Sequence, residues 1–291
     1  MYPLRVLGRP AVPSTPDQNG QRSNPPATSG IALGFERVTK VFPDGTRAVD
    51  GVTFQVRSGE MVAIVGPSGC GKSTLLRLAS RLTAPSSGEI RIGDGNLGYV
   101  FQDPTLLPWR TVQRNVELLA ELAGVSAAER TQRAAQAIIL TGLSGFERHR
   151  PRALSGGMRM RVSLARALTM RPRIFLFDEP FGALDEITRE RLNAELLGLF
   201  EREGFAGLFV THSVNEAAYL ASRVLVMSPR PGHIVAEIPI PFAYPRAPEL
   251  RFAAEFASVA GKQFKAAGLH ALLHYDPSAM LRAGSKRSAQ V

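Results

Sequence analysis

The residues of this chain with the clearest chemical meaning form a glycine-rich stretch, GPSGCGKST. It fits the pattern G-x-x-x-x-G-K-[ST], in which backbone N–H groups surround phosphate oxygens and the lysine reaches the β- and γ-phosphates of a nucleotide. The stretch follows the apolar run MVAIV and opens a helical pattern, which is the context that the motif requires. The residues expected to bind ATP here are Gly66, Pro67, Ser68, Gly69, Cys70, Gly71, Lys72, Ser73 and Thr74.

Two carboxylates follow another apolar run, RIFLFDEP, which predicts a buried strand ending in Asp178 and Glu179. Carboxylates at the C-terminal ends of strands face the ligand crevice of an open α/β sheet. Asp178 and the Ser73 hydroxyl are oxygen ligands that suit Mg²⁺, and Glu179 is placed to orient an attacking water. Phosphoryl transfer depends mainly on such positioning and on charge stabilisation. The pattern therefore predicts ATP hydrolysis with Mg²⁺.

Two further polar residues end predicted strands at the same sheet edge. Gln102, in VFQDP, is expected to reach both the Mg²⁺ ion and the attacking water. His212, in LFVTHS, is expected to hydrogen-bond an oxygen of the γ-phosphate. Either residue alone would be unremarkable, and it is their common edge with Asp178 that favours a functional role.

A second glycine-rich stretch, LSGGM, begins a predicted helix. Ser155, Gly156 and Gly157 offer a hydroxyl, exposed backbone N–H groups and a positive helix end to a phosphate. The phosphate loop of the same chain already surrounds its own ATP. The economical arrangement is therefore that LSGGM serves the ATP of a second copy, in a two-fold dimer that holds two ATP molecules between its chains.

The elements that position these residues follow from periodicity. Short apolar runs alternate with helical stretches, which predicts a mostly parallel sheet with both faces covered. Residues 103–169 carry no strand pattern and predict an inserted helical unit. Ser126 with Glu129 and Ser213 with Glu216 form capping-box patterns before helices. The expected strands cover 61–65, 97–101, 174–177, 208–210 and 224–227, besides alternating strands in 34–42 and 52–56.

Composition limits the class of protein. The 291 residues are 44% hydrophobic, enough for a sizeable core, and one cysteine excludes a disulfide framework within the chain. No run approaches the ~18 apolar residues of a membrane span, so another chain would have to hold this one at a membrane. The net charge of +10 is concentrated at the ends: residues 1–30 hold three arginines against one acid, and residues 241–291 hold seven Lys/Arg against three Asp/Glu.

Taken together, GPSGCGKST, VFQDP, LSGGM, IFLFDEP, GALD and VTHS resemble the motifs of ABC (ATP-binding cassette) ATPases, in the family's order and at suitable spacing. The resemblance runs from about residue 31 to 241. It implies an α/β fold: a P-loop NTPase (RecA-like) core with an antiparallel β subdomain and an inserted α-helical subdomain. It also implies that Phe42 stacks on adenine, that Asp185 shapes the dimer contact and that Glu179 is the catalytic carboxylate. One departure is Met158, where many members have Gln.

The expected domain organisation follows from that resemblance and from composition. Residues 1–30 are rich in Pro, Ser, Gly and Asn and predict a disordered tail. Residues 31–241 would form the ABC ATPase domain, with the helical subdomain inserted at about 103–169. Residues 242–291 turn rich in Ala, Leu and Phe after three prolines, and predict a helical extension.

A finer resemblance links LLPWRTVQRNV, LSGGMR and VMSPRPGHI to importer ATPases of the nitrate/sulfonate/taurine group. It implies a peripheral subunit on the cytoplasmic face of the plasma or inner membrane, with transmembrane permease subunits and, indirectly, a solute-binding protein as partners. Importers of pyrimidine precursors and of other small molecules share much of the sequence of these motifs. The residues at 106–109 also predict an apolar, rigid turn directly after Gln102, which would sit in a groove that receives a short permease helix. Alternatively, Trp109 packs within the helical insertion, and the turn connects Gln102 to the surface that faces the membrane.

Two other classes remain as alternatives. A soluble ABC ATPase that acts on nucleic acid or ribosomes would be favoured by the basic charge. Such families usually carry two cassettes or a long coiled coil, which this sequence lacks, and nucleic acid is not expected as a partner. A P-loop kinase or GTPase would leave LSGGM without a use, and no guanine-reading N-K-x-D sequence is present.

Overall fold

The computed structural model describes residues 30–263. A six-stranded sheet forms its centre, in the order β5-β6-β7-β3-β8-β9, and all neighbours are parallel except the antiparallel pair β8 and β9. The predicted parallel sheet is therefore confirmed. The strand β9 was not predicted, because its residues are partly exposed and give no apolar run. The strands are β3 (Met61–Val65), β5 (Leu97–Val100), β6 (Ile174–Asp178), β7 (Ala206–Thr211), β8 (Arg223–Met227) and β9 (Ile234–Pro239).

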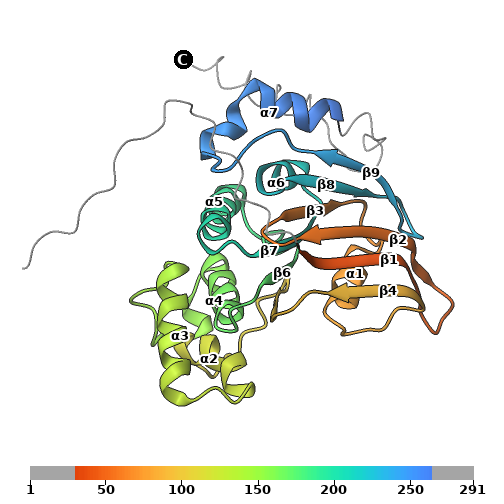
Figure 1. Cartoon of the computed structure of the whole chain (residues 1–291). Coiled ribbons are helices and arrows are strands. Elements are labelled where there is room, and N and C mark those ends of the chain that lie inside the picture. The colour runs from red at the N-terminus through yellow and green to blue at the C-terminus, as the bar shows by residue number, and fades with distance from the viewer. Residues whose placement is uncertain (1–29, 264–291) are drawn as a thin grey trace, which may run out of the picture.

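A second, antiparallel sheet packs beside the first, in the order β2-β1-β4 (Figure 1). Its strands are β1 (Ile31–Val41), β2 (Arg47–Arg57) and β4 (Ser87–Ile92). Residues 52–56 of β2 alternate between buried and exposed, as their sequence pattern predicted. The alternation predicted for 34–42 is wrong, because Ala32 to Phe35 of β1 are all buried and Glu36 and Arg37 are both exposed. This sheet is the antiparallel β subdomain that the family resemblance implied.

Helices cover both faces of the central sheet. The alternation along β3 shows the two sides: Met61 and Ala63 pack into one core with helices α5 (Glu186–Glu203) and α6 (Val214–Leu220). Val62 and Ile64 pack into the other core with α1 (Lys72–Ala79) and the antiparallel sheet. Because both faces are buried, β3 is apolar at every position and β6 at every position before Asp178.

Residues 103–169 contain α2 (Val112–Leu122), α3 (Ala127–Leu140), the short 3-10 turn η1 (Pro151–Ala153) and α4 (Gly156–Leu168), with no strand among them. These helices share a core of their own and lie at the lower left of Figure 1. Met158, Val162, Ala165 and Leu168 stand at helical spacing in the sequence, and all four pack in this core. On α3, Ala134, Ala137 and Ile138 are buried, whereas Leu140, the last residue of the helix, is partly exposed to solvent.

The predicted N-caps are confirmed, but neither capping box is complete within residues 30–263, since the Glu129 carboxylate accepts from Arg133 rather than from the Ser126 N–H. The side chains of Ser126 and Ser213 accept hydrogen bonds from the N–H groups of Glu129 and Glu216. The Glu216 carboxylate does not reach back to Ser213, and instead accepts hydrogen bonds from Asn193 and Thr211. Asn193 and Thr211 therefore take the place of the Ser213 N–H as donors to this carboxylate. Burying a carboxylate without hydrogen bonds would cost free energy.

The segment after β9 packs against α6. It forms the 3-10 turn η2 (Pro248–Phe252), α7 (Ala254–Ser258) and the π-helical turn η3 (Val259–Gln263). The buried guanidinium of Arg246 donates to the carbonyl oxygens of Ala218, Tyr219 and Ala221, which are free at the C-terminal end of α6. The predicted disordered tail, apart from Gly30, and the extension from residue 264 onward lie outside the described residues. No helix in 30–263 is long and apolar enough to cross a membrane.

Candidate functional site

The predicted phosphate loop connects β3 to α1 at the edge of the sheet. Gly69 and Gly71 have φ angles of +74° and +110°, and a Cβ atom on Gly71 would lie 2.7 Å from the carbonyl oxygen of Ala48. Only glycine fits there without strain. The Lys72 ammonium donates to the carbonyl oxygens of Gly66 and Pro67, at 2.9 and 3.1 Å. The loop is thus a cradle of backbone groups closed by one lysine, as a phosphate site requires.

Cys70 faces away from this cradle. Its side chain is only 1% exposed and packs under the loop. Burial raises the pKa of its thiol. Cys70 therefore fills space beneath the loop, and its predicted contact with ATP would be made by its backbone.

The predicted magnesium ligands come together at the end of β6. The Ser73 hydroxyl donates to Oδ1 of Asp178 at 2.7 Å, and the Tyr99 hydroxyl donates to Oδ2 at 3.1 Å. Burial, followed by the charge of Asp178, raises the pKa of Tyr99, so this phenol keeps its proton and remains a donor. Gln102 follows β5 and lines the same cleft as Ser73. Hydroxyl, carboxylate and amide oxygens fit Mg²⁺, which prefers oxygen ligands and keeps several waters.

Glu179 occupies a strained position beside the loop. Its φ angle of +45° lies in the left-handed region, which costs a non-glycine residue free energy and is common at functional sites. Its Oε2 lies 3.1 Å from Nδ1 of His212, and its Oε1 lies 3.8 Å from the Lys72 ammonium. The predicted carboxylate, lysine and histidine therefore form one cluster.

The Glu179–His212 pair predicts a pH-dependent term in stability. The hydrogen bond with His212 lowers the pKa of Glu179 below 4.5, and the same bond raises the pKa of His212 above 6.5. The ionised Glu179 carboxylate makes its full contribution to the free energy of unfolding above pH 4.5. The protonated His212 imidazole makes its full contribution below pH 6.5, so both contribute between these two pH values. The stability advantage over His212→Ala should shrink as the pH rises through the raised pKa of His212. Urea unfolding at pH 6 and pH 9 measures this, and an equal difference at both values would contradict it.

The predicted adenine contact, Phe42, lines the same cleft of about 380 Å³ as Lys72, Ser73 and Thr74. Arg230 also lines it, and its guanidinium donates to the carbonyl oxygen of Gly69 at 2.8 and 3.1 Å. Sequence reasoning missed Arg230, although VMSPRPGHI was singled out for its resemblance. We propose that Arg230 stabilises the phosphate loop through these two hydrogen bonds to Gly69.

Lys72→Ala is expected to weaken ATP binding by about 10–100-fold, because a charge-assisted hydrogen bond contributes about 1.5–3 kcal/mol. Equilibrium titration with a fluorescent ATP analogue measures the change. Arg148→Ala is the control, because it removes one positive charge at an exposed position that does not line the cleft. Wild-type affinity in Lys72→Ala would contradict the phosphate-loop assignment.

The second glycine-rich stretch stands apart from this cleft. Ser155 caps α4, and its side chain accepts from the N–H of Met158 at 3.2 Å. None of Ser155, Gly156 and Gly157 is among the described residues that line the cleft. Asp185 caps α5 and accepts from the N–H of Thr188 at 3.0 Å, which lowers the pKa of Asp185. Within one chain, Ser155 and Asp185 therefore act as helix N-caps. Their roles at the contact between two chains stay predictions.

Comparison with known proteins supports the same reading. Residues 49–182 match the family model of the ABC transporter. The taurine import ATP-binding protein TauB of Yersinia pestis is 44% identical over 205 residues, 68% of this chain and 80% of TauB. An uncharacterized ABC transporter ATP-binding protein of Methanocaldococcus jannaschii is 44% identical over 226 residues, 74% of this chain and 85% of that protein.

A solved structure gives the same result for the fold. The dimeric structure of MJ0796, a bacterial ABC transporter cassette, is 34% identical and superposes with a TM-score of 0.64 over 72% of this chain and 99% of that one. A second structure of that cassette, bound to ADP and Pi, superposes with a TM-score of 0.63 at 33% identity, over the same shares of both chains. The chain therefore belongs to the ABC transporter family of ATP-binding proteins and is a Mg²⁺-dependent ATPase.

Proposed function

We propose that the chain is the energy-coupling subunit of a membrane importer for a small solute of the nitrate, sulfonate or taurine kind. The observation that carries the proposal is that the phosphate loop and Glu179 line one cleft, whereas Ser155, which opens α4, does not line it. Two copies placed head to tail would bring each LSGGM stretch to the partner's ATP. The 44% identity to a taurine import protein supports the solute class.

Within such a dimer the roles of the chain's own residues follow from their positions. The loop glycines and Lys72 would hold the phosphates, and Ser73, Asp178 and Gln102 would hold the Mg²⁺ ion, which neutralises phosphate charge when bound. Glu179 would orient the attacking water, and His212, which holds its carboxylate, would also contact the γ-phosphate. Closure of the dimer on ATP and its opening after hydrolysis would drive a permease between its two states.

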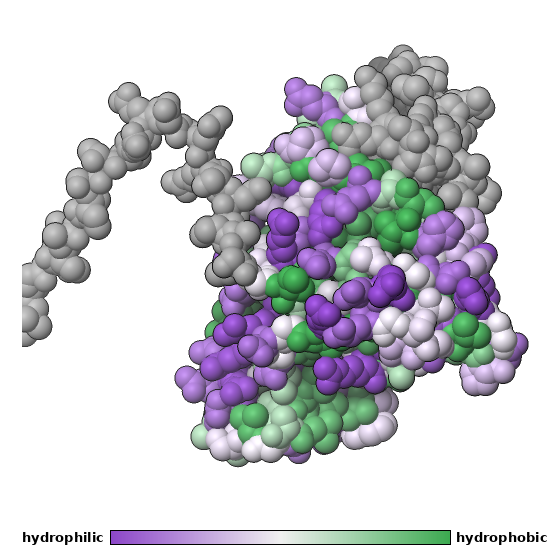
Figure 2. Space-filling model, turned by 45° about the vertical axis from the view of Figure 1, so that its right-hand side comes forward, coloured by the Kyte–Doolittle hydropathy of each residue, from purple (hydrophilic) through white to green (hydrophobic). Residues whose placement is uncertain are grey.

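The surface proposed to meet the permease lies on the helical subdomain. Figure 2 shows apolar side chains gathered at the lower end of the molecule, at the height of α2 and α3 in Figure 1. Trp109 is 68% exposed, and Leu122 and Ile139 are also exposed on these helices and the preceding turn. Trp109 therefore does not pack into the helical core, and its neighbour Leu106 does so instead. An exposed indole of this kind is typical of a binding surface.

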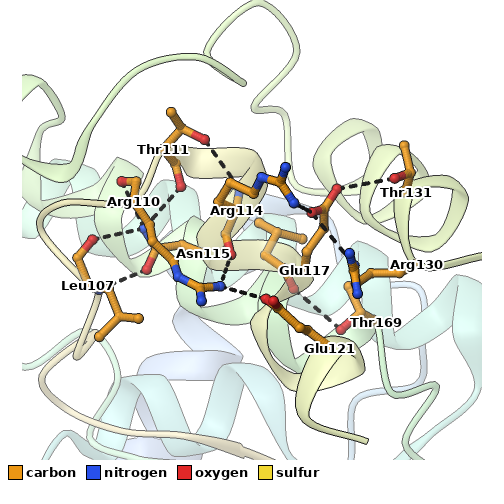
Figure 3. A network of polar contacts seen from close by, with 11 residues as sticks. Leu107, Arg110, Thr111, Arg114, Asn115, Glu117, Glu121, Arg130, Thr131 and Thr169 are labelled. Carbon is orange, nitrogen blue, oxygen red and sulfur yellow. Dashed lines mark hydrogen bonds and ion pairs between the residues drawn. The ribbon is translucent and has the colours of Figure 1, made fainter. Parts of the chain in front are cut away.

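A buried asparagine fixes the turn that carries Trp109 (Figure 3). Asn115 is 0% exposed, and its Oδ1 accepts from the N–H of Leu107 at 2.8 Å. Its amide nitrogen donates to the carbonyl oxygens of Leu107, Arg110 and Thr111 at 3.0–3.1 Å. The side chain thus provides partners for the Leu107 N–H and the Arg110 carbonyl oxygen. The carbonyl oxygens of Leu107 and Thr111 also accept from the backbone N–H groups of Arg110 and Asn115. Such a rigid turn costs less entropy on binding than a mobile one.

Asn115→Ala is expected to lower the free energy of unfolding by about 1–3 kcal/mol, because it leaves the Leu107 N–H without its partner in a buried position. Urea unfolding measures the loss. Gln132→Ala, on the exposed face of α3, is the control and should change stability by less than about 0.5 kcal/mol. Equal stabilities of the two variants would show that the turn holds without Asn115.

The decisive experiment is a pull-down from native membranes with tagged Glu179→Gln protein and ATP, followed by mass spectrometry. Recovery of a multi-span permease would support the importer, and the solute-binding protein encoded with it would indicate the solute, including a pyrimidine precursor or another small molecule. Recovery of ribosomes or nucleic acid alone would favour the soluble ABC ATPase instead. That alternative has the net charge of +10 in its favour.

A further inference from the structure

A cavity of about 630 Å³ lies between α3, α4 and α5, on the side of the sheet away from the antiparallel strands. Figure 1 shows these three helices next to one another at the left of the molecule. The cavity shares no lining residue with the nucleotide cleft, so it is a separate space. Its volume lies within the ~300–1,000 Å³ that is typical of small-molecule sites.

The walls of the cavity are apolar and its rim is cationic. Met160, Leu164, Phe177 and Leu196 supply the apolar walls, and most of the exposed lining is carbon. Three arginines, Arg161, Arg191 and Arg202, lie among the lining residues of the described chain against one carboxylate, Glu195. Four of these lining residues carry charge, and the balance is positive, which favours an anion.

Among the described residues at the rim, the single carboxylate does not neutralise all three arginines. Glu195 accepts from Nη2 of Arg161 at 2.5 Å and lies 3.9 Å from Nε of Arg191, so its charge is shared by two guanidinium groups. Nε of Arg161 is buried and has no hydrogen-bond partner within residues 30–263. Since Nε has almost no accessible surface, a ligand in the cavity would reach Arg161 through the terminal nitrogens of its guanidinium rather than through Nε. Arg202 makes no ion pair within the same range.

We propose that this cavity binds an amphipathic monocarboxylate, with its carboxylate at Arg161 and Arg202 and its aliphatic body against Phe177 and Leu196. A guanidinium and a carboxylate form charge-assisted hydrogen bonds in a fork geometry, and the apolar walls favour the aliphatic chain by burial. The site is close to the catalytic end of β6, because the lining residues Pro180 and Phe181 directly follow Glu179. An occupant would touch the segment that carries Glu179 and, through Met160, the helix that begins at Ser155.

Decanoate, titrated calorimetrically into the full-length protein below its micellar concentration, is the probe. Decanol and decylamine, which have the same chain with a neutral or cationic head, are the matched ligands. Decanoate is expected to bind saturably with one site per chain, and both controls at least tenfold more weakly. Arg161→Gln should weaken decanoate binding roughly tenfold, the effect of one lost charge-assisted hydrogen bond.

Two variants fill the cavity without changing its charge. A Cβ atom on Gly198, in the interior of α5, would meet only the end of the Arg202 side chain at 3.7 Å, so Gly198→Leu should fold normally and occupy the cavity. Ala194→Leu fills it from the preceding turn. Both should abolish decanoate binding while thermal unfolding and ATP binding stay as in the wild type. No saturable binding, equally tight binding of decanol, or unchanged binding in both filled variants would overturn the proposal.

Discussion

Glu179→Gln is expected to lower the rate of ATP hydrolysis by about 10²–10⁴-fold, which is the usual contribution of a positioned general base. The amide keeps the shape of the side chain but cannot accept a proton from the attacking water. ATP binding should remain, because Lys72 and the loop glycines are unchanged. The variant should therefore accumulate as an ATP-bound dimer, measured by phosphate release and by gel filtration with ATP.

The control for this prediction is Glu255→Gln, which removes an exposed carboxylate on α7, far along the chain from the cluster of Glu179 with Lys72 and His212. It should hydrolyse ATP at the wild-type rate. Hydrolysis by Glu179→Gln within tenfold of the wild type would exclude Glu179 as the catalytic carboxylate. A variant that hydrolyses slowly but stays monomeric with ATP would instead contradict the shared site between two chains.

Ser155→Arg is expected to lower ATP hydrolysis at least about 100-fold while ATP affinity per chain stays nearly unchanged. The arginine would place a bulky cation at the surface that closes on the partner's ATP, and burying it without a partner costs several kcal/mol. Since the described cleft does not include Ser155, binding of ATP to a single chain should not sense the change. Hydrolysis and nucleotide titration on the same preparation separate the two effects.

Ser144→Arg is the matched control, because Ser144 is an exposed serine of the same helical subdomain and gains the same charge. It should hydrolyse ATP normally. Retained hydrolysis in Ser155→Arg would mean that LSGGM does not take part in the reaction. Loss of ATP affinity per chain would place Ser155 at the nucleotide of its own chain.

The sequence predicted the phosphate loop, the paired carboxylates and the parallel strands well, because each depends on a few consecutive residues. The burial of β3 and β6 on both faces produces apolar runs that can be recognised directly. β4 and β9 were missed because many of their residues are exposed, so the alternation of apolar and polar residues is weak. The pairing partner of β4 is also distant in sequence, since Leu33 of β1 lies opposite Ile92. Strands at a sheet edge give little local signal.

Within the site, the missed features are those that long-range contacts create. Nothing in LGYVF indicates that the Tyr99 hydroxyl reaches Asp178, 79 positions further along the chain. The bond from Arg230 to Gly69 and the positive φ of Glu179 likewise depend on how distant strands are placed. Motif spacing identified which residues meet at the sheet edge, and tertiary packing decided which atoms face one another.

The contact of Arg246 with α6 has a consequence for where a functional fragment of this protein can end. The helix that Arg246 caps begins directly after His212, so the polar end of α6 and the histidine of the site belong to one short rigid piece. A chain cut at Pro241 would satisfy every sequence motif, yet it would leave three carbonyls of that helix without their donor. It would also remove Phe256 from the core beneath them. Ala260 packs in the same core, so we expect the minimal working cassette to extend at least through Ala260, beyond the boundary that the motifs alone would set.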